Sequence, residues 1–296
     1  MAPAERRLRL IVNPQAGGGR ARRALPAVQA RLRELGLPFT TDLTDGLDDG
    51  RTLAAAAAEA GEVAVAFSGD GVAAAVAGVL REHGDGVLGL LPGGRGNDFA
   101  RVLGIPLDPV AACDVLAHGV ERRIDLGLAA GRPFIGIASL GFDSDANRIA
   151  NRAPARLGNL VYVYGALVAL VRWHPATFTV VVDGHTETFQ GWAVAAANSR
   201  AYGGGMFVAP AAELDDGALD VVLTRRTSKL TFLRCLPRVF RGTHVRLRSV
   251  TVRRGSQIVI AADRGFTVYA DGDPIGSLPI TLRAVPAALH VLLPAA

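Results

Sequence analysis

The sequence contains a single lysine, Lys229, among its 296 residues. No glycine-rich loop precedes this lysine, so a Walker-type phosphate-binding loop is excluded. The protein-kinase arrangement, which needs a lysine on a strand ahead of its catalytic loop, is excluded by the same count. Any nucleotide must therefore be held by backbone amides, arginine, small polar groups and a metal ion.

Cysteines and long apolar runs are also scarce. Cys113 and Cys235 alone provide neither a disulfide framework nor a four-thiolate metal site. The most apolar stretch, residues 157–171, has about 15 residues, whereas a membrane span needs about 20. The N-terminus passes from charged residues straight into a short strand-like run, without the apolar core of a secretory signal. We expect a cytoplasmic protein.

Acidic residues are absent from Arg225 to Arg254, a segment with ten Arg or Lys residues that we call the basic block. The net charge of the chain is +5, so the rest of the chain carries −5. Leu, Phe and Val are interleaved with these cations, which suits an anionic bilayer or a polyphosphate. The alternative is a solvated face on an arginine-rich chain. No zinc-finger or aromatic RNA-binding signature is present, and we expect no nucleic-acid partner.

The order of apolar and helical segments predicts two kinds of sheet. Strand-like runs at residues 8–12, 38–43, 63–67 and 87–91 alternate with helical stretches, which predicts a parallel, doubly wound α/β layer. After Asp125 the strands are short, and Asp-Gly pairs at Asp183 and Asp271 mark tight turns between them. This second half is typical of an antiparallel β-sandwich.

Three of the early strands are each followed by a glycine-bearing turn. Ligands of open α/β sheets bind at the carboxyl ends of strands, so we expect these turns to share one crevice. Their glycines would let backbone N–H groups approach phosphates closely. Asp70, between Gly69 and Gly71, is suited to holding Mg2+ or positioning a phosphate. A single glycine-bearing turn is only a tight connection between a strand and a helix in about half of cases. Three such turns in register are harder to explain as plain connections.

The motifs in these turns resemble, in order and spacing, the catalytic domain of the diacylglycerol kinase family, which includes bacterial lipid kinases, sphingosine kinases and ceramide kinases. The landmarks are IVNP from Ile11, GGG from Gly17, SGDG from Ser68 and PGGRGNDFAR from Pro92. The resemblance continues through later landmarks: Asp125-Leu126-Gly127, Gly141-Phe142-Asp143, residues 198–205, Ala209-Pro210, DDGALD at 215–220 and Asp271-Gly272-Asp273.

The resemblance implies the fold and the domains. It implies an N-terminal Rossmann-like α/β nucleotide-binding domain and a C-terminal antiparallel β-sandwich domain, as in NAD kinases and diacylglycerol kinases. Residues 1–128, with about 284–296 returning, would form the ATP-binding catalytic domain. Residues 129–283 would form the lipid-binding domain.

The resemblance also implies roles for individual residues, with ATP and Mg2+ as cofactors. Asp70 and Asp125 would belong to one catalytic carboxylate network, and Asp273 would be the general base that accepts the proton of a lipid hydroxyl. Asp216, with the main-chain carbonyls of Glu213 and Ala218, resembles a second, structural Mg2+ site. The implied nucleotide contacts are Asn13, Gly17, Gly18, Gly19, Thr44, Ser68, Gly69, Asp70, Gly71, Gly94, Arg95 and Asn97. Without the resemblance, Asp216 and Asp273 would be read as ordinary turn residues.

The implied activity is ATP-dependent phosphorylation of a hydroxyl on diacylglycerol or a related lipid, within phospholipid biosynthesis, by an enzyme bound peripherally to an anionic membrane. Three positions depart from the family pattern: Asp273 replaces the usual Glu, and Val72 and Arg95 each replace a Thr. Two alternatives stay open, an NAD kinase-like enzyme and a non-catalytic nucleotide- or lipid-binding regulatory protein. The NDFAR and DDGxLD motifs favour the lipid kinases over the NAD kinases. The acceptor lipid and a homodimeric state are left open.

Overall fold

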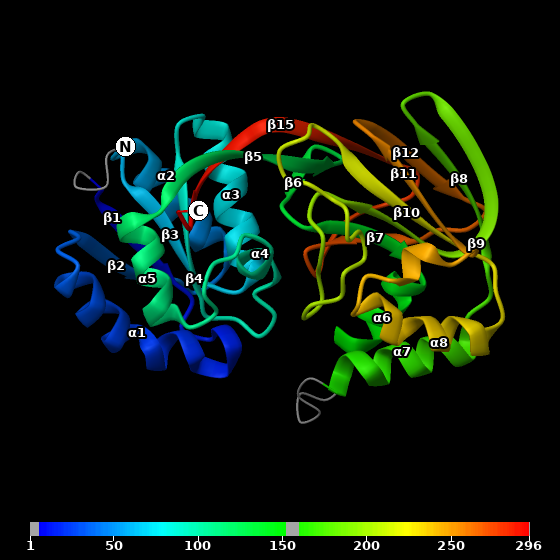
Figure 1. Ribbon diagram of the computed structural model, residues 1–296, viewed down its shortest axis with the longest axis horizontal. Coiled ribbons are helices and arrows are strands. Elements are labelled where there is room, and N and C mark those ends of the chain that lie inside the picture. Colours follow the sequence, from blue (N-terminus) through cyan, green and yellow to red (C-terminus); the bar gives the residue numbers. More distant parts are fainter. Residues whose placement is uncertain (1–5, 152–159, 296) are drawn as a thin grey trace.

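The computed structural model describes residues 6–151 and 160–295 and shows two lobes side by side (Figure 1). The first lobe is a layer of parallel strands with helices packed against it, and the second is built of antiparallel strands. The predicted fold class, a Rossmann-like α/β domain followed by a β-sandwich domain, is confirmed.

The first lobe contains parallel strands in the order β2-β1-β3-β4. Every residue of β3 and β4 is buried, as expected for strands covered on both faces. The strands of this lobe are β1 (Leu8–Val12), β2 (Phe39–Leu43), β3 (Val63–Ser68) and β4 (Val87–Pro92). Its helices are α1 (Ala16–Glu34), α2 (Leu47–Glu59), α3 (Asp70–His83), α4 (Asp98–Val102) and α5 (Pro109–His118).

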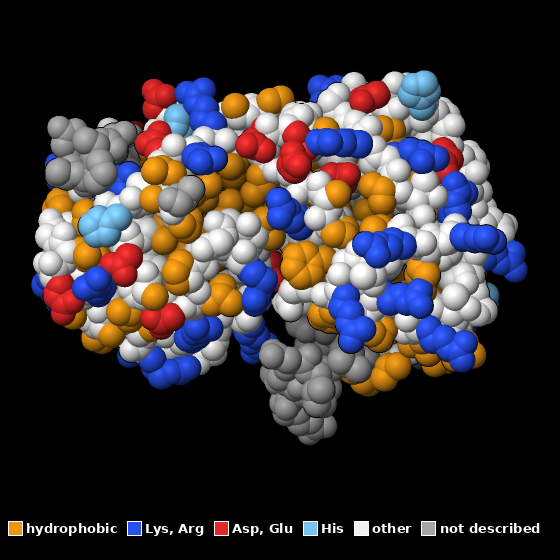
Figure 2. Space-filling view, in the orientation of Figure 1, with side chains coloured by type: hydrophobic (Ala, Val, Ile, Leu, Met, Phe, Trp, Pro, Cys, Tyr) orange, Lys and Arg blue, Asp and Glu red, His pale blue; other side chains and the backbone are white. Residues whose placement is uncertain are grey.

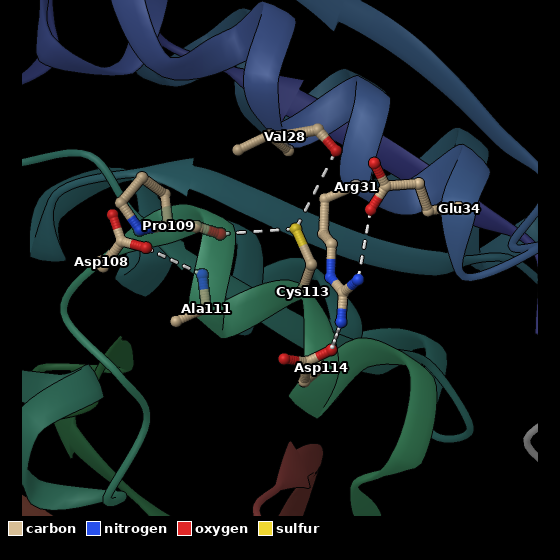
Figure 3. A network of polar contacts seen from close by, with 8 residues as sticks. All are labelled: Val28, Arg31, Glu34, Asp108, Pro109, Ala111, Cys113 and Asp114. Carbon is tan, nitrogen blue, oxygen red and sulfur yellow. Dashed lines mark hydrogen bonds and ion pairs between the residues drawn. The ribbon is translucent and has the colours of Figure 1, made fainter.

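Polar contacts join α5 to α1 (Figure 3). Asp108 caps α5 by accepting a hydrogen bond from the Ala111 N–H at 2.9 Å. Arg31 of α1 donates to Asp114 of α5 at 2.7 Å. Between these contacts Cys113 is fully buried, and burial raises the pKa of its thiol to about 12. This thiol is therefore a protonated core group at neutral pH.

The second lobe is antiparallel, with β9 at its centre between β7, β8 and β10. The β8–β9 hairpin turns at Asp183 and Gly184, which have φ angles of 45° and 84°, as a two-residue hairpin turn requires. The strands are β6 (Arg132–Phe134), β7 (Ile137–Gly141), β8 (Ala176–Val182), β9 (His185–Ala197), β10 (Leu219–Arg225), β11 (Val250–Gly255), β12 (Gln257–Ala262), β13 (Thr267–Ala270) and β14 (Asp273–Ser277).

Three helices cover one end of this lobe (Figure 1). An aromatic cluster lies beneath them, in which the Trp192 ring stacks on Phe232 at 4.2 Å between centroids and Phe142 meets Trp173 edge-on at 5.7 Å. No helix within the described residues is both long and apolar enough to cross a membrane. The helices are α6 (Phe142–Asn151), α7 (Leu160–Arg172) and α8 (Lys229–Val239), and a short 3-10 turn, His244–Arg246, follows them.

Two long antiparallel strands, β5 (Val120–Ala129) and β15 (Ile280–Leu293), run through both lobes (Figure 1). The first half of β15 pairs with β12, and its residues His290 and Val291 pair in parallel with β4 of the first lobe. Between the halves the register shifts, and Ala287 has a φ of 48°. The C-terminal strand therefore returns to the first lobe, while the domain boundaries at 128 and 284 stay predictions.

Close packing where β5 crosses between the lobes generates the first prediction. A Cβ added to Gly127 would lie 2.1 Å from the nearest atom of the Phe134 ring, which is itself 1% exposed and has no room to move. Gly127→Ala should lower the free energy of unfolding by about 1–3 kcal/mol, because overpacking a filled core forces side chains out of position. Thermal melting measures the change, expected as a fall of several degrees.

Gly265→Ala is the matched control, because nothing lies within 4 Å of a Cβ at that position. Its melting temperature should equal that of the unchanged protein. Equal melting temperatures for the two variants would contradict the packing argument.

Candidate active site between the two lobes

The three glycine turns that follow β1, β3 and β4 are packed against one another. A Cβ on Gly17 would lie 2.5 Å from the main-chain oxygen of Gly93, and one on Gly94 would lie 2.5 Å from the Cα of Gly69. The N–H groups of Gly93 and Gly94 both donate to the main-chain oxygen of Ser68, at 2.8 and 3.1 Å. The structure thus brings the predicted turns together at one edge of the sheet, with a contact distance that only glycine allows.

The first turn has a backbone that other residues rarely adopt. Gly17, Gly18 and Gly19 have φ angles of 58°, 68° and 84°. Asn13 shapes the entrance to the turn, since its Oδ1 accepts from the Gln15 N–H at 3.0 Å. The side chain of Asn13 therefore supports the loop directly, and its predicted contact with nucleotide stays a prediction.

Asp70 connects the second and third turns. It lies in the first turn of α3, and its carboxylate accepts the N–H groups of Asp98 and Phe99, at 3.1 and 3.0 Å, from the start of α4. Asn97, just before α4, has a φ of 50°, and its side-chain amide exchanges two hydrogen bonds with the main chain of Gly94 at 2.8 and 3.0 Å. Both side chains therefore fix the shape of the third turn.

Asp98 is a site residue that sequence reasoning did not single out, although it lies inside the NDFAR motif. Its Oδ2 accepts the N–H of Gly204 in the second lobe at 2.7 Å. Its Oδ1 is buried without a hydrogen-bond partner among the described residues. Burial raises the pKa of the neighbouring Asp70 carboxyl, and the negative charge of Asp98 adds to the rise. The two carboxylates concentrate negative charge where both lobes meet.

Asp273 approaches the same place from the second lobe. It begins β14 and is exposed, and its Oδ2 lies 3.6 Å from where a Cβ on Gly71 would be. A Cβ on Gly96 would lie 3.4 Å from Asp70 Oδ2, so the third turn borders the same carboxylates. The predicted general base and the predicted phosphate-binding turns therefore face each other across the junction.

Asp271 fixes the turn that carries Asp273. Its carboxylate accepts three main-chain N–H groups, from Ile135 at 2.8 Å, Gly136 at 2.9 Å and Ile137 at 3.2 Å. Burial, with the nearby charge of Asp70, raises the pKa of Asp271 to about 7. The sequence identified this residue as part of a tight turn and of a family motif. It did not reveal the role of the carboxylate, because its three partners are more than 130 positions away in the chain.

The remaining predicted nucleotide contacts lie around the turns. Thr44, just after β2, is buried, and its hydroxyl oxygen has no partner among the described residues. Ser68 is buried at the end of β3, and Arg95 is exposed at the tip of the third turn. Val72, where the family pattern has Thr, is only 5% exposed and belongs to the core of the first lobe.

Asp125 accepts main-chain hydrogen bonds where β5, β15 and the loop before β10 meet. Its carboxylate accepts the Gly217 N–H at 2.6 Å and the Ala287 N–H at 2.7 Å. It thereby ties β5 to the loop before β10 and to the irregularity in β15. The hydrogen bonds of Asp125 make it a junction residue, and its membership of the Asp70 network stays a prediction.

The predicted structural Mg2+ site has a protein cation beside it. One oxygen of Asp216 accepts the Ala218 N–H at 2.9 Å, and the other forms an ion pair with Arg254 of β11. Across residues 6–151 and 160–295, no three His, Cys, Asp or Glu side chains gather to hold a metal ion. Coordination by Asp216 with the carbonyls of Glu213 and Ala218 stays a prediction, and such a metal would compete with Arg254.

Two family descriptions match the chain. "Diacylglycerol kinase catalytic domain" matches residues 7–129, and "YegS C-terminal NAD kinase beta sandwich-like domain" matches residues 136–293.

Curated relatives match over nearly the whole length. The chain is 37% identical to a protein named diacylglycerol kinase from Mycobacterium tuberculosis over 292 residues, which cover 96% of this chain and 94% of the relative. It is 28% identical to a diacylglycerol kinase from Bacillus subtilis over 297 residues, covering 98% and 97%. It is 32% identical to a YegS-like lipid kinase of Pseudomonas aeruginosa over 292 residues, covering 97% and 94%.

Crystal structures of Bacillus anthracis proteins have the same fold. One matches with a TM-score of 0.85 and 20% identity, covering 99% of this chain and 96% of the other. Another has a TM-score of 0.76 and 19% identity, covering 98% and 97%. The arrangement of the two lobes is therefore found in experimentally determined structures.

The raised pKa of Asp271 predicts a pH-dependent stability. Between about pH 4 and 7 the unfolded state would lose this proton while the folded state keeps it, so the contribution of Asp271 to stability falls as pH rises through that interval. Asp271→Asn removes the titrating group and should flatten this part of the curve. Chemical unfolding of both proteins from pH 4 to 8 measures the difference; parallel curves would refute the assignment.

The Arg254–Asp216 pair generates a stability prediction. Arg254→Met should lower the free energy of unfolding by about 1–2 kcal/mol, because it leaves a carboxylate with a side-chain exposure of 14% without its cation. Arg253→Met is the matched control, since Arg253 is the neighbouring residue of β11 and pairs instead with Glu187. It should cost less than 1 kcal/mol, as surface pairs do.

Melting without nucleotide, with and without Mg2+, completes this test. We expect Mg2+ to leave the unchanged protein unaffected. A rise in its melting temperature that Asp216→Asn abolishes would show that a metal displaces Arg254 at Asp216. Equal losses for the two variants would remove the special role of this pair.

Proposed function

The chain belongs to the diacylglycerol kinase family, and on this premise we propose that it is an ATP-dependent lipid kinase that transfers the γ-phosphoryl group to a hydroxyl of diacylglycerol or a related lipid. The observation that carries the proposal is the position of Asp273. This carboxylate, from the second lobe, faces Gly71 at the start of α3, where the glycine turns converge.

The glycine turns would bind the phosphates of ATP. Their main-chain N–H groups lie at the N-terminal ends of α1, α3 and α4, and such ends attract anions. Gly17, Gly69 and Gly94 have no side chain, so the turns pack closely and none of these residues stands in the way of a phosphate. The exposed Arg95 at the tip of the third turn would add a positive charge beside the phosphates.

The carboxylates at the junction fit a bound Mg2+ ion. Hard oxygen ligands suit Mg2+, and Asp98 Oδ1 is a buried oxygen that lacks a partner in the described structure. Asp98 and Asp70 would hold the ion together with the phosphates. When bound, the ion would supply neutralisation of the charge that develops during phosphoryl transfer.

Asp273 would act on the acceptor. A lipid hydroxyl is a poor nucleophile, and a carboxylate within hydrogen-bond reach can take its proton as the phosphoryl group transfers. Asp273 is exposed and lies opposite the phosphate-binding turns, so a hydroxyl placed between them would meet both. The three main-chain hydrogen bonds of Asp271 would keep this base in place.

Transfer of labelled γ-phosphate from ATP, with Mg2+, to a panel of lipids in micelles tests the proposal. We expect a labelled lipid, and its identity names the acceptor. Labelled NADP from a parallel reaction with NAD would instead establish an NAD kinase. ATP binding without any labelled product would establish a non-catalytic nucleotide-binding protein.

Asp273→Asn should lower kcat about 100- to 10,000-fold, the range expected for loss of a general base, while ATP binding stays unchanged. Asp273→Glu should retain much of the activity, because it keeps the carboxylate. Asp263→Asn is the control, since Asp263 is exposed and, among residues 6–151 and 160–295, its carboxylate accepts only the Thr177 N–H. Full activity in Asp273→Asn would exclude Asp273 as the base.

A further inference from the structure

The helix α8 leaves apolar side chains uncovered. It has no buried residue, and one side of it is held on the lobe by Phe232, which stacks on Trp192 at 4.2 Å. Leu230 in its first turn and Phe240 at its end are 59% and 51% exposed. Large apolar side chains with this exposure at both ends of one helix form a surface that water solvates poorly.

The helix α7 extends this surface. Its exposed apolar residues Tyr164, Leu167 and Val171 are 45%, 52% and 77% exposed, and their spacing of three and four residues places them on one side of the helix. Lys229 Nζ donates to the main-chain oxygen of Val171 at 2.8 Å, so the end of α7 adjoins the start of α8. We call these five exposed apolar residues of the two helices the α7–α8 face: Tyr164, Leu167, Val171, Leu230 and Phe240.

The structure divides the basic block into two parts. Arg225 and Arg253 pair with Glu187, and Arg254 pairs with Asp216, so these three cations serve the second lobe itself. The other seven have no ion pair with any described residue. All seven are exposed. Arg226 and Lys229 donate hydrogen bonds to Gln190 and to the main chain of Val171. The other five, on α8 or just after it, have no described side-chain partner: Arg234, Arg238, Arg241, Arg246 and Arg248.

The free cations lie next to the apolar residues. Arg234 and Arg238 follow Leu230 at intervals of four, which places all three along one stripe of α8. Figure 2 shows basic and hydrophobic side chains side by side over the end of the second lobe where Figure 1 draws α7 and α8. No Asp or Glu occurs between residues 226 and 252 to neutralise this side.

We infer that the α7–α8 face is a docking surface for an anionic lipid bilayer. Exposed apolar side chains that enter the headgroup region, flanked by arginines that contact lipid phosphates, are the features of an interfacial helix. The inference rests on the proposed function, because a kinase whose acceptor is a membrane lipid has to work at the bilayer surface. A second copy of the chain is a poorer occupant, since a twofold contact would bring the unpaired arginines of both copies together without an acid between them.

Vesicle sedimentation with the full chain tests this inference. We expect binding to vesicles of phosphatidylcholine with phosphatidylglycerol, weaker binding to phosphatidylcholine alone, and weaker binding as salt rises. The combined variant Arg234→Gln, Arg238→Gln and Arg241→Gln should bind the anionic vesicles roughly 100-fold more weakly, at about fivefold for each cation. Leu167→Ser with Val171→Ser should weaken binding at high salt as well, because the apolar contribution is not screened.

Matched variants elsewhere on the chain provide the controls. Arg33→Gln, Arg122→Gln and Arg283→Gln together remove three exposed cations away from this face, and Leu43→Ser removes an apolar side chain that is 58% exposed on β2. These variants should bind vesicles like the unchanged protein. Circular dichroism and phosphorylation of a short-chain, water-soluble lipid check that every variant is folded and competent.

The outcomes separate the surface from the activity. Undiminished vesicle binding by the arginine variant, or an equal loss in the control variant, overturns the docking inference while leaving the kinase proposal intact. Loss of vesicle binding in the α7–α8 variants, but not in the controls, supports the docking surface. Absence of any phosphorylated lipid would overturn the kinase proposal and leave this conclusion about the surface unchanged. The inference would also be overturned if the unchanged protein did not bind vesicles and instead formed concentration-dependent dimers that the Leu167 and Val171 substitutions abolish. A second copy of the chain would then be the occupant of this face.

Discussion

The arrangement of the site depends on the two strands, β5 and β15, that the lobes share. Residues near one end of each strand belong to the first hydrophobic core, and residues near the other end belong to the second. The strands pair with each other on both sides of the irregularity at Ala287, where the carboxylate of Asp125 accepts the Ala287 N–H. Ladder hydrogen bonds thus continue from one lobe into the other, which limits how freely the lobes can turn against each other. Asp273 and the glycine turns can therefore face each other although 200 residues separate Asp273 from Gly71.

The junction concentrates carboxylates whose negative charges repel one another. Main-chain N–H groups partly offset the negative charges of Asp70 and Asp98. Asp70 accepts hydrogen bonds from the start of α4, and Asp98 accepts one from Gly204. These hydrogen bonds come from backbone positions that the glycine turns fix. Neither carboxylate has an ion pair with another described residue. The proposed ligands would relieve this repulsion, because a divalent cation would offset the carboxylates and the phosphates would lie at the N-terminal ends of the helices.

Most of the fold, and those parts of the site that lie within short stretches of the chain, could be predicted from the sequence. Continuous apolar runs such as residues 63–67 predicted buried parallel strands, and Asp-Gly pairs predicted the hairpin turns. Both patterns depend only on residues that are adjacent in the chain. The glycines of the three turns were found for the same reason. The partners of Asp98, Asp125 and Asp271 could not be predicted, since each contact joins segments that are more than 100 residues apart in the chain and meet only in the folded protein. A carboxylate in a turn looks the same in the sequence whether it accepts backbone N–H groups, pairs with arginine or faces a substrate.

The basic block shows how much of a charge pattern the fold can alter. In the sequence its ten cations look equivalent, and the net charge of the segment suggests a single surface. Strand pairing places Arg253 and Arg254 on β11 beside acids of neighbouring segments, so their charges stabilise the lobe and are largely neutralised for an external partner. Helix formation has the opposite effect on Arg234 and Arg238, because α8 packs through Phe232 and turns these side chains to solvent. The capacity of this segment to attract an anionic surface is therefore set by the seven cations that the fold leaves without an ion pair. Six of the seven lie on α8 or in the segment just after it.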